Sequence, residues 1–227
     1  MNMEGKRQII FEYLSAAIRA AKKDRPLRVA IDGVDAAGKT TLADELGKGL
    51  AAGGGKIIRA SIDGFHNPRA VRYRRGRMSP EGYYRDSFNN QAVIDNLLAP
   101  LGPGGTRRCK TAVFDFRTDR AVAGDLTVAT EDSILIMEGV FLLRPELNDF
   151  WDLKIFIDAD FSSTLPRAVK RDRDYLGGEA AVIDAYKCRY IPGQEIYFKE
   201  ADPKSAADIV VDNNNFDSPG IVKRSER

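Results

Sequence analysis

The chain carries, after its first 32 residues, the segment Gly33-Val34-Asp35-Ala36-Ala37-Gly38-Lys39-Thr40. This spacing of two glycines followed by lysine and a hydroxyl side chain is the Walker A pattern. A short apolar run, 27–31, precedes the segment, and leucines follow it at helical spacing, at positions 42, 46 and 50. We therefore predict a strand, a phosphate-binding loop and a helix in succession, which is the context in which this motif carries weight.

The residue types of the loop explain what it would bind. Glycines let backbone N–H groups close around phosphate oxygens, and the following helix presents the positive end of its dipole. Lys39 offers a charge to the β- and γ-phosphates, and Thr40 offers a hydroxyl to Mg²⁺. We thus predict ATP as the phosphoryl donor, with Mg²⁺, and assign nucleotide binding to Gly33, Asp35, Ala36, Ala37, Gly38, Lys39, Thr40 and Thr41.

The rest of the chain continues the alternation of strands and helices. Helical spacing of apolar residues predicts an N-terminal helix within 1–25. Buried strands are predicted at 56–62, 133–137, 153–157 and 208–211, and a further helix is predicted around 93–98. Alternation of this kind favours an α/β fold, a three-layer P-loop NTPase sandwich with a mostly parallel sheet flanked by helices. We expect one domain over 1–215, a lid and following helix over about 160–200, and a frayed tail over 216–227.

Two carboxylates follow predicted strands. Glu138 ends the apolar run 133–137, at the sheet edge where ligands of parallel sheets collect, so with Thr40 it is a candidate Mg²⁺ ligand; a helix cap is the alternative. Asp63 ends the second strand, and a kinase needs a carboxylate beside the attacking hydroxyl, although an Asp-Gly turn would also explain it. His66 is the only histidine. It receives no catalytic role, but it can face the acceptor.

Arginines form two groups. Arg167 and Arg171 lie four residues apart on a predicted helix, where guanidinium groups can hold a transferring phosphoryl group; a solvated basic face is the alternative. The segment 69–82 has no periodicity and is expected to be a surface loop. Its arginines, between Arg69 and Arg77, form a flap near the acceptor site in our interpretation, and whether they contact the substrate is left open.

Composition and charge argue against nucleic-acid-binding, membrane and secreted proteins. A net charge of +2, from 35 basic and 33 acidic residues, gives no general attraction to nucleic acid or to membrane surfaces. No apolar run is long enough to span a membrane, and the N-terminus lacks a secretory pattern. The two cysteines, Cys109 and Cys188, have no metal-ligand or redox spacing. We expect a cytoplasmic protein that acts on a small molecule, without nucleic acid or membrane partners, and compatible with a homo-oligomer.

The order of these motifs resembles the uridine kinase and phosphoribulokinase family of P-loop kinases, which includes bacterial-type pantothenate kinase. The resemblance runs from about residue 27 to 213 and rests on the phosphate-binding loop, Asp63-Gly64-Phe65, Tyr84-Arg85-Asp86-Ser87-Phe88, Phe114-Asp115-Phe116, Met137-Glu138-Gly139-Val140-Phe141, Phe156-Ile157-Asp158, Arg167 to Asp172 and Ala207-Asp208-Ile209-Val210. It implies a base at Asp63, a metal-associated acid at Glu138 and lid arginines at Arg167 and Arg171. It also implies acceptor contacts from His66, Tyr84, Phe114 and Asp119.

The acceptor segments differ from the uridine kinase pattern. Phe114 stands where uridine kinases usually carry tyrosine, and Asp119 stands where they carry histidine. The segment around Asp63 is at least as close to pantothenate kinases, and Asp35 in the loop is reminiscent of thymidylate kinase. An acid in that loop must point away from phosphates, toward an acceptor hydroxyl.

Two kinds of function fit the motifs. A kinase with a nucleoside acceptor, uridine- or cytidine-like, is favoured, and pantothenate, a sugar phosphate or another small metabolite are the alternatives. A nucleotide-hydrolysing switch or binding module is the other class. A guanine switch needs an Asn-Lys-x-Asp element, and Asn213-Asn214-Asn215 lacks its lysine and aspartate.

Overall fold

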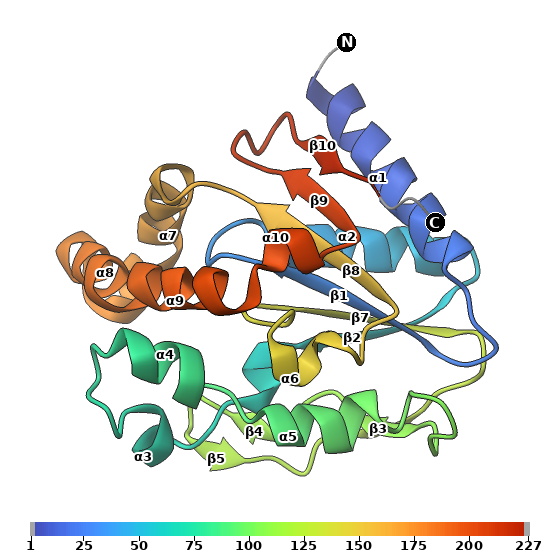
Figure 1. The fold of residues 1–227 in the computed structure, drawn as a ribbon, viewed down its shortest axis with the longest axis horizontal. Helices are drawn as coiled ribbons and strands as arrows, with labels where there is room; N and C mark the ends of the chain where they lie inside the picture. The colour runs from blue at the N-terminus through green and yellow to red at the C-terminus, as the bar shows by residue number, and fades with distance from the viewer. Residues whose placement is uncertain (1–2, 225–227) are drawn as a thin grey trace.

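A computed structural model describes residues 3–224 and contains a six-stranded sheet in the order β10-β9-β8-β1-β7-β2 (Figure 1). The strands are β1 (Leu27–Gly33), β2 (Lys56–Ser61), β7 (Ser133–Gly139), β8 (Leu153–Asp158), β9 (Ile209–Asp212) and β10 (Gly220–Lys223). The first five strands run parallel, and β10 pairs antiparallel with β9. The carboxyl ends of β1, β2 and β7 therefore meet at one edge of the sheet.

Helices cover both faces of this sheet, which makes it the middle layer of three (Figure 1). Alternate residues of β1 show the division: Val29 and Ile31 belong to one buried cluster, and Ala30 belongs to the other. The first cluster is covered by α1 (Met3–Ala20) and α2 (Lys39–Ala52). The second is covered mainly by α4 (Pro80–Asp86), α5 (Asn90–Val93), the π-helical turn η2 (Ile94–Leu98), α6 (Pro145–Asn148) and α9 (Ile191–Ala201). The short helix α10 (Pro203–Ala206) lies against β8 and α9. The predicted fold class is confirmed.

The segment expected to form a lid consists of α7 (Phe161–Leu176), α8 (Glu179–Ala185) and a π-helical turn, η3 (Tyr186–Tyr190), that runs into α9. Figure 1 shows α7 and α8 at one side of the sheet. They bury a small cluster of their own, Ala168, Val182 and Tyr186, separate from the two main cores. Gly177 and Gly178 join α7 to α8 with φ values of +92° and +113°, a conformation that glycine adopts without steric cost.

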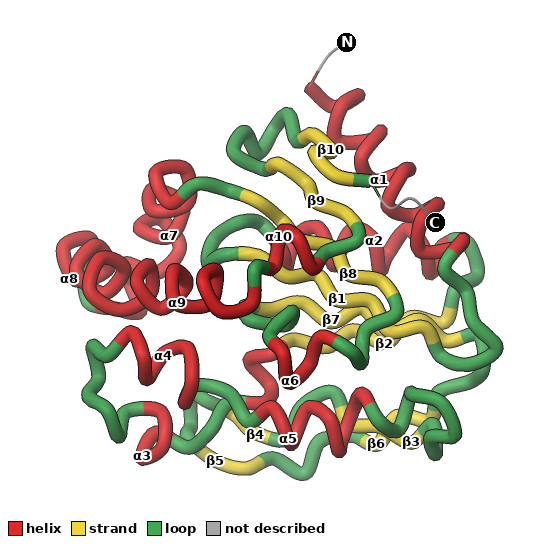
Figure 2. The backbone as a smooth tube through the Cα atoms, viewed as in Figure 1, coloured by secondary structure: helices red, strands yellow, loops and turns green. Residues whose placement is uncertain are grey.

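Two short antiparallel pairs lie on the side of α5 (Figure 2). One pair joins β3 (Arg108–Lys110) to β6 (Leu126–Val128), and the other joins β4 (Phe114–Asp115) to β5 (Arg120–Ala121). Strands of two or three residues carry too little alternation to be recognised from the sequence.

Two expectations differ from the structure. The segment 69–82, expected to be a loop, contains α3 (Arg69–Arg72) and the first turn of α4. The side chain of Ser79 accepts a hydrogen bond from the backbone of Gly82 at 3.0 Å and caps α4, with Pro80 in the first turn.

The tail expected to fray over 216–227 contains β10. The open edge of β9 offers backbone partners to Gly220 and Ile221, and Ile221 also packs against the first core cluster, which explains the order there. Residues 225–227 of that tail and residues 1 and 2 of the expected N-terminal helix lie outside the described residues.

Candidate active site

A cavity of about 790 Å³ lies at the carboxyl edge of the sheet, between the loop after β1 and the lid. It brings together most of the predicted site residues from segments far apart in the chain. Those that line it are Asp35, Ala36, Gly38, Lys39, Thr40, Thr41, Asp63, His66, Glu138, Arg167 and Arg171. A cavity of this size is in the range of small-molecule sites.

The phosphate-binding loop has a backbone that only small residues permit. A Cβ on Gly33 would lie 2.5 Å from the carbonyl oxygen of Ile157, and one on Gly38 would lie 2.7 Å from Nδ2 of Asn213. The side chain of Asn213 donates a hydrogen bond to the carbonyl of Ala37 at 2.7 Å and so supports the loop from the end of β9. Lys39 is buried and donates to the carbonyl of Val34 at 2.7 Å.

Glu138 meets the requirements of a cation ligand. Strand pairing places it level with Ser61 of β2 and Ile31 of β1. It is only 7% exposed, and within residues 3–224 no hydrogen bond or ion pair satisfies its carboxylate. In the same residues no cluster of three metal-ligating side chains occurs. Glu138 with the Thr40 hydroxyl therefore suits Mg²⁺, which takes few protein ligands and completes its shell with phosphates and water.

Asp63 lies in the short 3-10 helix η1 (Ile62–Phe65), where its backbone N–H donates to Ser61 Oγ at 3.3 Å. Its carboxylate is 58% exposed, and Oδ1 is 3.4 Å from Nε2 of His66. Partial burial at the edge of the cavity raises the pKa of Asp63, but His66, Lys39 and Arg171 together outweigh that effect and lower the pKa below its usual value. Asp63 is therefore ionised at neutral pH, as a proton acceptor must be.

His66 is more closely tied to Asp63 than a lone histidine in the sequence suggests. Its ring lies between Phe88 and Phe116, with centroid distances of 4.4 and 4.9 Å. Nδ1 is 3.0 Å from the carbonyl of Ser87, which can only accept, so Nδ1 carries a proton. Nε2 can then donate to Asp63 only when the ring carries both protons.

The two predicted lid arginines differ in their partners. Arg167 donates through Nη2 to the carbonyls of Asn213 and Asn214, at 3.0 and 2.6 Å, while its buried Nη1 has no partner among the described residues. Arg171 pairs with Asp172 at 2.7 Å and contacts the hydroxyl of Tyr186 at 3.1 Å. The bond to Asp172 raises the pKa of Arg171, which stays charged.

Asp35 of the phosphate-binding loop is hydrogen-bonded to residues of other elements. Its backbone N–H donates to Oε1 of Gln194 at 2.7 Å, and its carboxylate accepts from the hydroxyl of Tyr83, on α4, at 2.6 Å. Burial and the nearby Asp35 charge raise the pKa of Tyr83 well above 10, so this hydroxyl keeps its proton.

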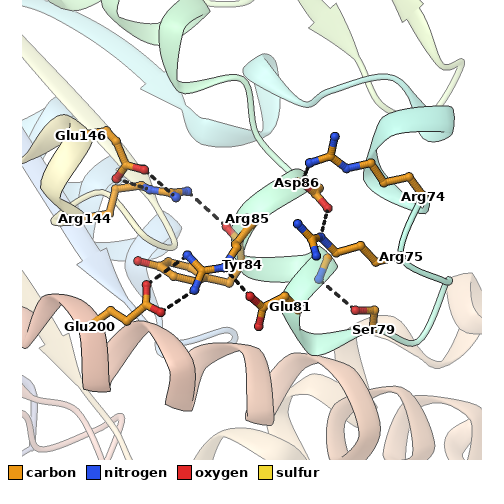
Figure 3. Close-up of polar contacts among 11 residues, drawn as sticks. Arg74, Arg75, Ser79, Glu81, Tyr84, Arg85, Asp86, Arg144, Glu146 and Glu200 are labelled. Atoms are coloured by element: carbon orange, nitrogen blue, oxygen red, sulfur yellow. Dashed lines mark hydrogen bonds and ion pairs between the residues drawn. The ribbon is translucent and has the colours of Figure 1, made fainter.

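Three predicted acceptor contacts do not line the cavity. Tyr84 is 1% exposed and packs on Phe141 and Tyr197, with the guanidinium of Arg144 at 4.7 Å from its ring, because the turn of α4 directs Tyr83 to the cavity instead. Figure 3 shows Tyr84 beside Arg85 and Arg144.

Phe114 and Asp119 are the other two. Phe114 lies within β4, and Phe116, beyond the end of that strand, lines the cavity in its place. Asp119 pairs instead with Nη2 of Arg72 at 3.0 Å and accepts from the backbone N–H of Arg69 at 2.8 Å. At the cavity, Tyr84 and Phe114 are thus replaced by their sequence neighbours Tyr83 and Phe116.

The arginines between Arg69 and Arg77 differ in whether they reach the cavity. Arg74 and Arg75 pair with the buried Asp86 at 2.5 and 2.8 Å, and they lower its pKa although burial opposes this (Figure 3). Arg72 lines the cavity. The segment is therefore fixed to α4 on one side and reaches the site on the other.

Several cavity residues were missed in the sequence. They are mainly Tyr73, Tyr83, Tyr186, Arg189 and Tyr190. Asp32, fully buried beneath the loop, was also missed; burial raises its pKa, and Tyr197, Leu143 and Gly33 donate hydrogen bonds to it. Its signal was an acid within the apolar strand 27–33, whereas the tyrosines and arginines carry no motif.

The sheet order, the phosphate-binding loop and the arginine-bearing helix after β8 define the class of P-loop kinases. The family model for the phosphoribulokinase/uridine kinase family matches residues 29–216. The chain belongs to this family, and the predicted family and enzyme class, phosphotransfer to an alcohol group, are confirmed.

Individual relatives agree with this assignment. A uridine kinase from Ligilactobacillus salivarius is 24% identical over 195 residues, covering 85% of this chain and 87% of that protein. A pantothenate kinase from Rhodopseudomonas palustris is 29% identical over 152 residues, covering 61% of this chain and 47% of the other.

A solved structure of a possible uridine kinase from Bacillus stearothermophilus superposes with a TM-score of 0.70 at 23% identity, covering 88% of this chain and 96% of that one. At this identity the likeness supports the fold only. In residues 3–224, none of the helices has the length and apolar character needed to cross a bilayer.

Proposed function

We propose that this protein transfers the γ-phosphoryl group of ATP to a hydroxyl of a small polar metabolite bound beside Asp63. The observation that carries the proposal is electrostatic. The carboxylate of Asp63 shares one cavity with Lys39 and Arg171, and both cations act on its pKa. A proton acceptor and the cations that neutralise phosphate charge thus act on the same small volume, as in-line phosphoryl transfer requires.

The donor would lie in the phosphate-binding loop. Backbone N–H groups at the start of α2 face the phosphates there, and Lys39 exchanges its bond to the Val34 carbonyl for phosphate oxygens. Bound Mg²⁺, held by Thr40 and Glu138, would neutralise charge on the β- and γ-phosphates. The unpartnered Nη1 of Arg167 and the charged Arg171 supply further donors for the transferring group.

The acceptor hydroxyl would donate a hydrogen bond to Asp63. As its oxygen bonds to the γ-phosphorus, the bond from that phosphorus to the bridging oxygen of ADP breaks, and Asp63 takes the proton. Because the pKa of Asp63 is lowered, its carboxylate is ionised and can accept a hydrogen bond from the hydroxyl in the ground state.

A nucleoside is the acceptor that the resemblance favours, and the uridine kinase relative supports it. Against it, Phe114 and Asp119 do not reach the cavity. The pantothenate kinase relative supports the alternative of a small hydroxy acid, and a sugar phosphate is the third candidate.

The test is Asp63→Asn, assayed for ADP release coupled to acceptor phosphorylation. The amide cannot take the proton, so kcat should fall about a hundredfold while the affinity for ATP is kept. Lys39→Ala serves as the blank, and Asp125→Asn, on the exposed surface, is the matched control. Near wild-type turnover in Asp63→Asn would remove the base assignment, and phosphate release without any acceptor product would favour a hydrolytic switch.

A further inference from the structure

Two arginines that the proposed chemistry does not use line the same cavity as Asp63. Arg72 comes from α3 and is 6% exposed, and Arg189 comes from η3 and is 5% exposed. Neither belongs to the phosphate-binding loop or to the pair Arg167 and Arg171. Their burial beside an enzyme cavity needs a reason, because burying a charge without a partner is costly.

Arg189 lacks an acid partner. Within the described residues no carboxylate lies at ion-pair distance from its guanidinium, and its Nη1 donates only to the carbonyl of Arg77. Aromatic rings surround it instead, with its Cζ atom 5.2 Å from the centroid of Tyr73 and 5.5 Å from that of Tyr83. These contacts orient the guanidinium but leave its charge unneutralised.

The π-helical form of η3 explains why the side chain of Arg189 faces the cavity. A π-helical turn widens the helix by an extra residue and redirects side chains, and such turns occur often at functional sites. Here the turn Tyr186–Tyr190 directs three cavity-lining side chains inward: Tyr186, Arg189 and Tyr190. Lys187 of the same turn is exposed.

Arg72 adds a second cation with spare bonding capacity. Asp119 neutralises it through Nη2, but its buried Nε has no partner within residues 3–224. The Cζ of Arg72 lies 5.5 Å from the centroid of Tyr73, so both guanidinium groups contact one ring. Of these two buried cations, only Arg72 has a carboxylate partner within the described residues. Three other acids that line the cavity have partners of their own, Asp35 with Tyr83, Asp63 with His66 and Asp172 with Arg171. The fourth, Glu138, is the proposed Mg²⁺ ligand.

We propose that Arg72 and Arg189 form an anion subsite for the phosphoryl acceptor, so that the acceptor carries a carboxylate or phosphate group in addition to its reacting hydroxyl. The inference rests on the proposed kinase function and specifies its substrate class. Guanidinium groups bind both anions through paired hydrogen bonds, which explains arginine at both positions. Uncharged nucleosides lack such a group.

Matched acceptors test the substrate class. Pantothenate is compared with panthenol, in which a neutral alcohol replaces the carboxylate, and ribulose 5-phosphate is compared with ribulose; uridine and cytidine complete the panel. The wild-type protein should give a higher kcat/KM with the charged member of a pair. A preference within the pantothenate pair would indicate a carboxylate, and a preference within the ribulose pair would indicate a phosphate. Preference for uridine, cytidine or a neutral member overturns the subsite.

The arginine variant tests the residues. Arg189→Met should lower kcat/KM for a charged acceptor about thirtyfold, the loss expected for one charge-assisted hydrogen bond, and should leave the neutral partner unchanged. Lys187→Met removes the same charge from the exposed side of the same turn and should change neither value. An equal loss on both members of a pair would mean that Arg189 only supports the fold.

A binding experiment remains decisive if the panel lacks the natural acceptor. With saturating MgADP, inorganic phosphate should raise the melting temperature of the wild-type protein and of Lys187→Met, and this rise should be lost in Arg189→Met. A rise that is absent in the wild type, or that is lost in Arg171→Met but kept in Arg189→Met, overturns the proposal. Because this experiment measures binding and not turnover, it tests the anion subsite separately from the catalytic role of Asp63, which the Asp63→Asn assay tests.

Discussion

The contact between Asp63 and His66 shows how a single residue position sets the chemistry of the site. The ring of His66 is fixed by Phe88, Phe116 and the carbonyl of Ser87, so Nε2 faces Asp63 in one orientation. The part of His66 in the proposed reaction is to position Asp63 and to lower the pKa of that carboxylate.

A pH profile tests this relation. Because protonated His66 favours ionised Asp63, His66→Asn should raise the pKa of Asp63, and the acidic limb of kcat/KM should move to higher pH. The limb is measured by coupled ADP release between about pH 3.5 and 7, with melting temperature as a check of folding. Reduced activity with an unmoved limb would show that His66 only packs against its aromatic neighbours.

Among the elements, the first strand is fixed at its start by a buried ion pair. Asp152, just before β8, accepts from Arg25 at 2.6 Å and from Arg28 of β1 at 3.2 Å. Burial raises the pKa of Asp152, but these two arginines outweigh it and lower the pKa to about 2. The pair thus helps to set the position of β1, which carries the phosphate-binding loop at its other end.

Removing that carboxylate should cost stability. Asp152→Asn leaves the buried Arg28 without its counter-charge and should lower the free energy of unfolding by about 3 kcal/mol, measured by urea denaturation at pH 7. Asp174→Asn, whose side chain is 96% exposed, is the control and should change little.

The same variant has a pH signature. The depressed pKa means that Asp152 stabilises the fold above about pH 4, the unfolded value, and that this contribution is lost as pH falls toward 2. Asp152→Asn should lack this part of the acid dependence. Parallel acid curves for wild type and variant would contradict the role given to the pair.

For the whole molecule, the separate core of the lid is the feature with consequences for motion. Ala168, Val182 and Tyr186 pack with one another and not in either main core, and glycines join α7 to α8. Regions with few contacts to the main core open at lower free energy than the sheet. The proposed ligands, by contrast, contact both the lid and the sheet edge.

Amide hydrogen exchange tests this picture. Without ligand, residues 161–190 should exchange faster than β7, and a non-hydrolysable ATP analogue with Mg²⁺ should slow them by about tenfold or more when it is bound at a large excess over Kd. Lys39→Ala, which weakens nucleotide binding, should not show the slowing. Equal exchange in the lid with and without nucleotide would exclude coupling between them.

Prediction from the sequence worked best where chemistry lies in consecutive residues. The glycines of the loop, Lys39 and Thr40 act through one stretch of backbone, and the apolar runs give the parallel strands because both of their faces are buried. Glu138 and Asp63, which both line the cavity, could be predicted as candidates for the same reason, since each directly follows such a run. Tyr84, Phe114 and Asp119 do not line the cavity, because the direction of a side chain depends on the phase of its element against neighbouring elements.

The sequence by itself determined the phosphate-binding loop, the parallel strands of the main sheet and the family. Only the tertiary structure decided which tyrosines and arginines enclose the acceptor side of the cavity. Arg72 and Arg189 are 117 positions apart, and their burial around Tyr73 depends on how α3 and η3 pack. A phosphate-binding loop is formed by consecutive residues and can therefore be recognised in the sequence. The balance of charges around a cavity depends on segments that are distant in the sequence and come together only in the folded chain.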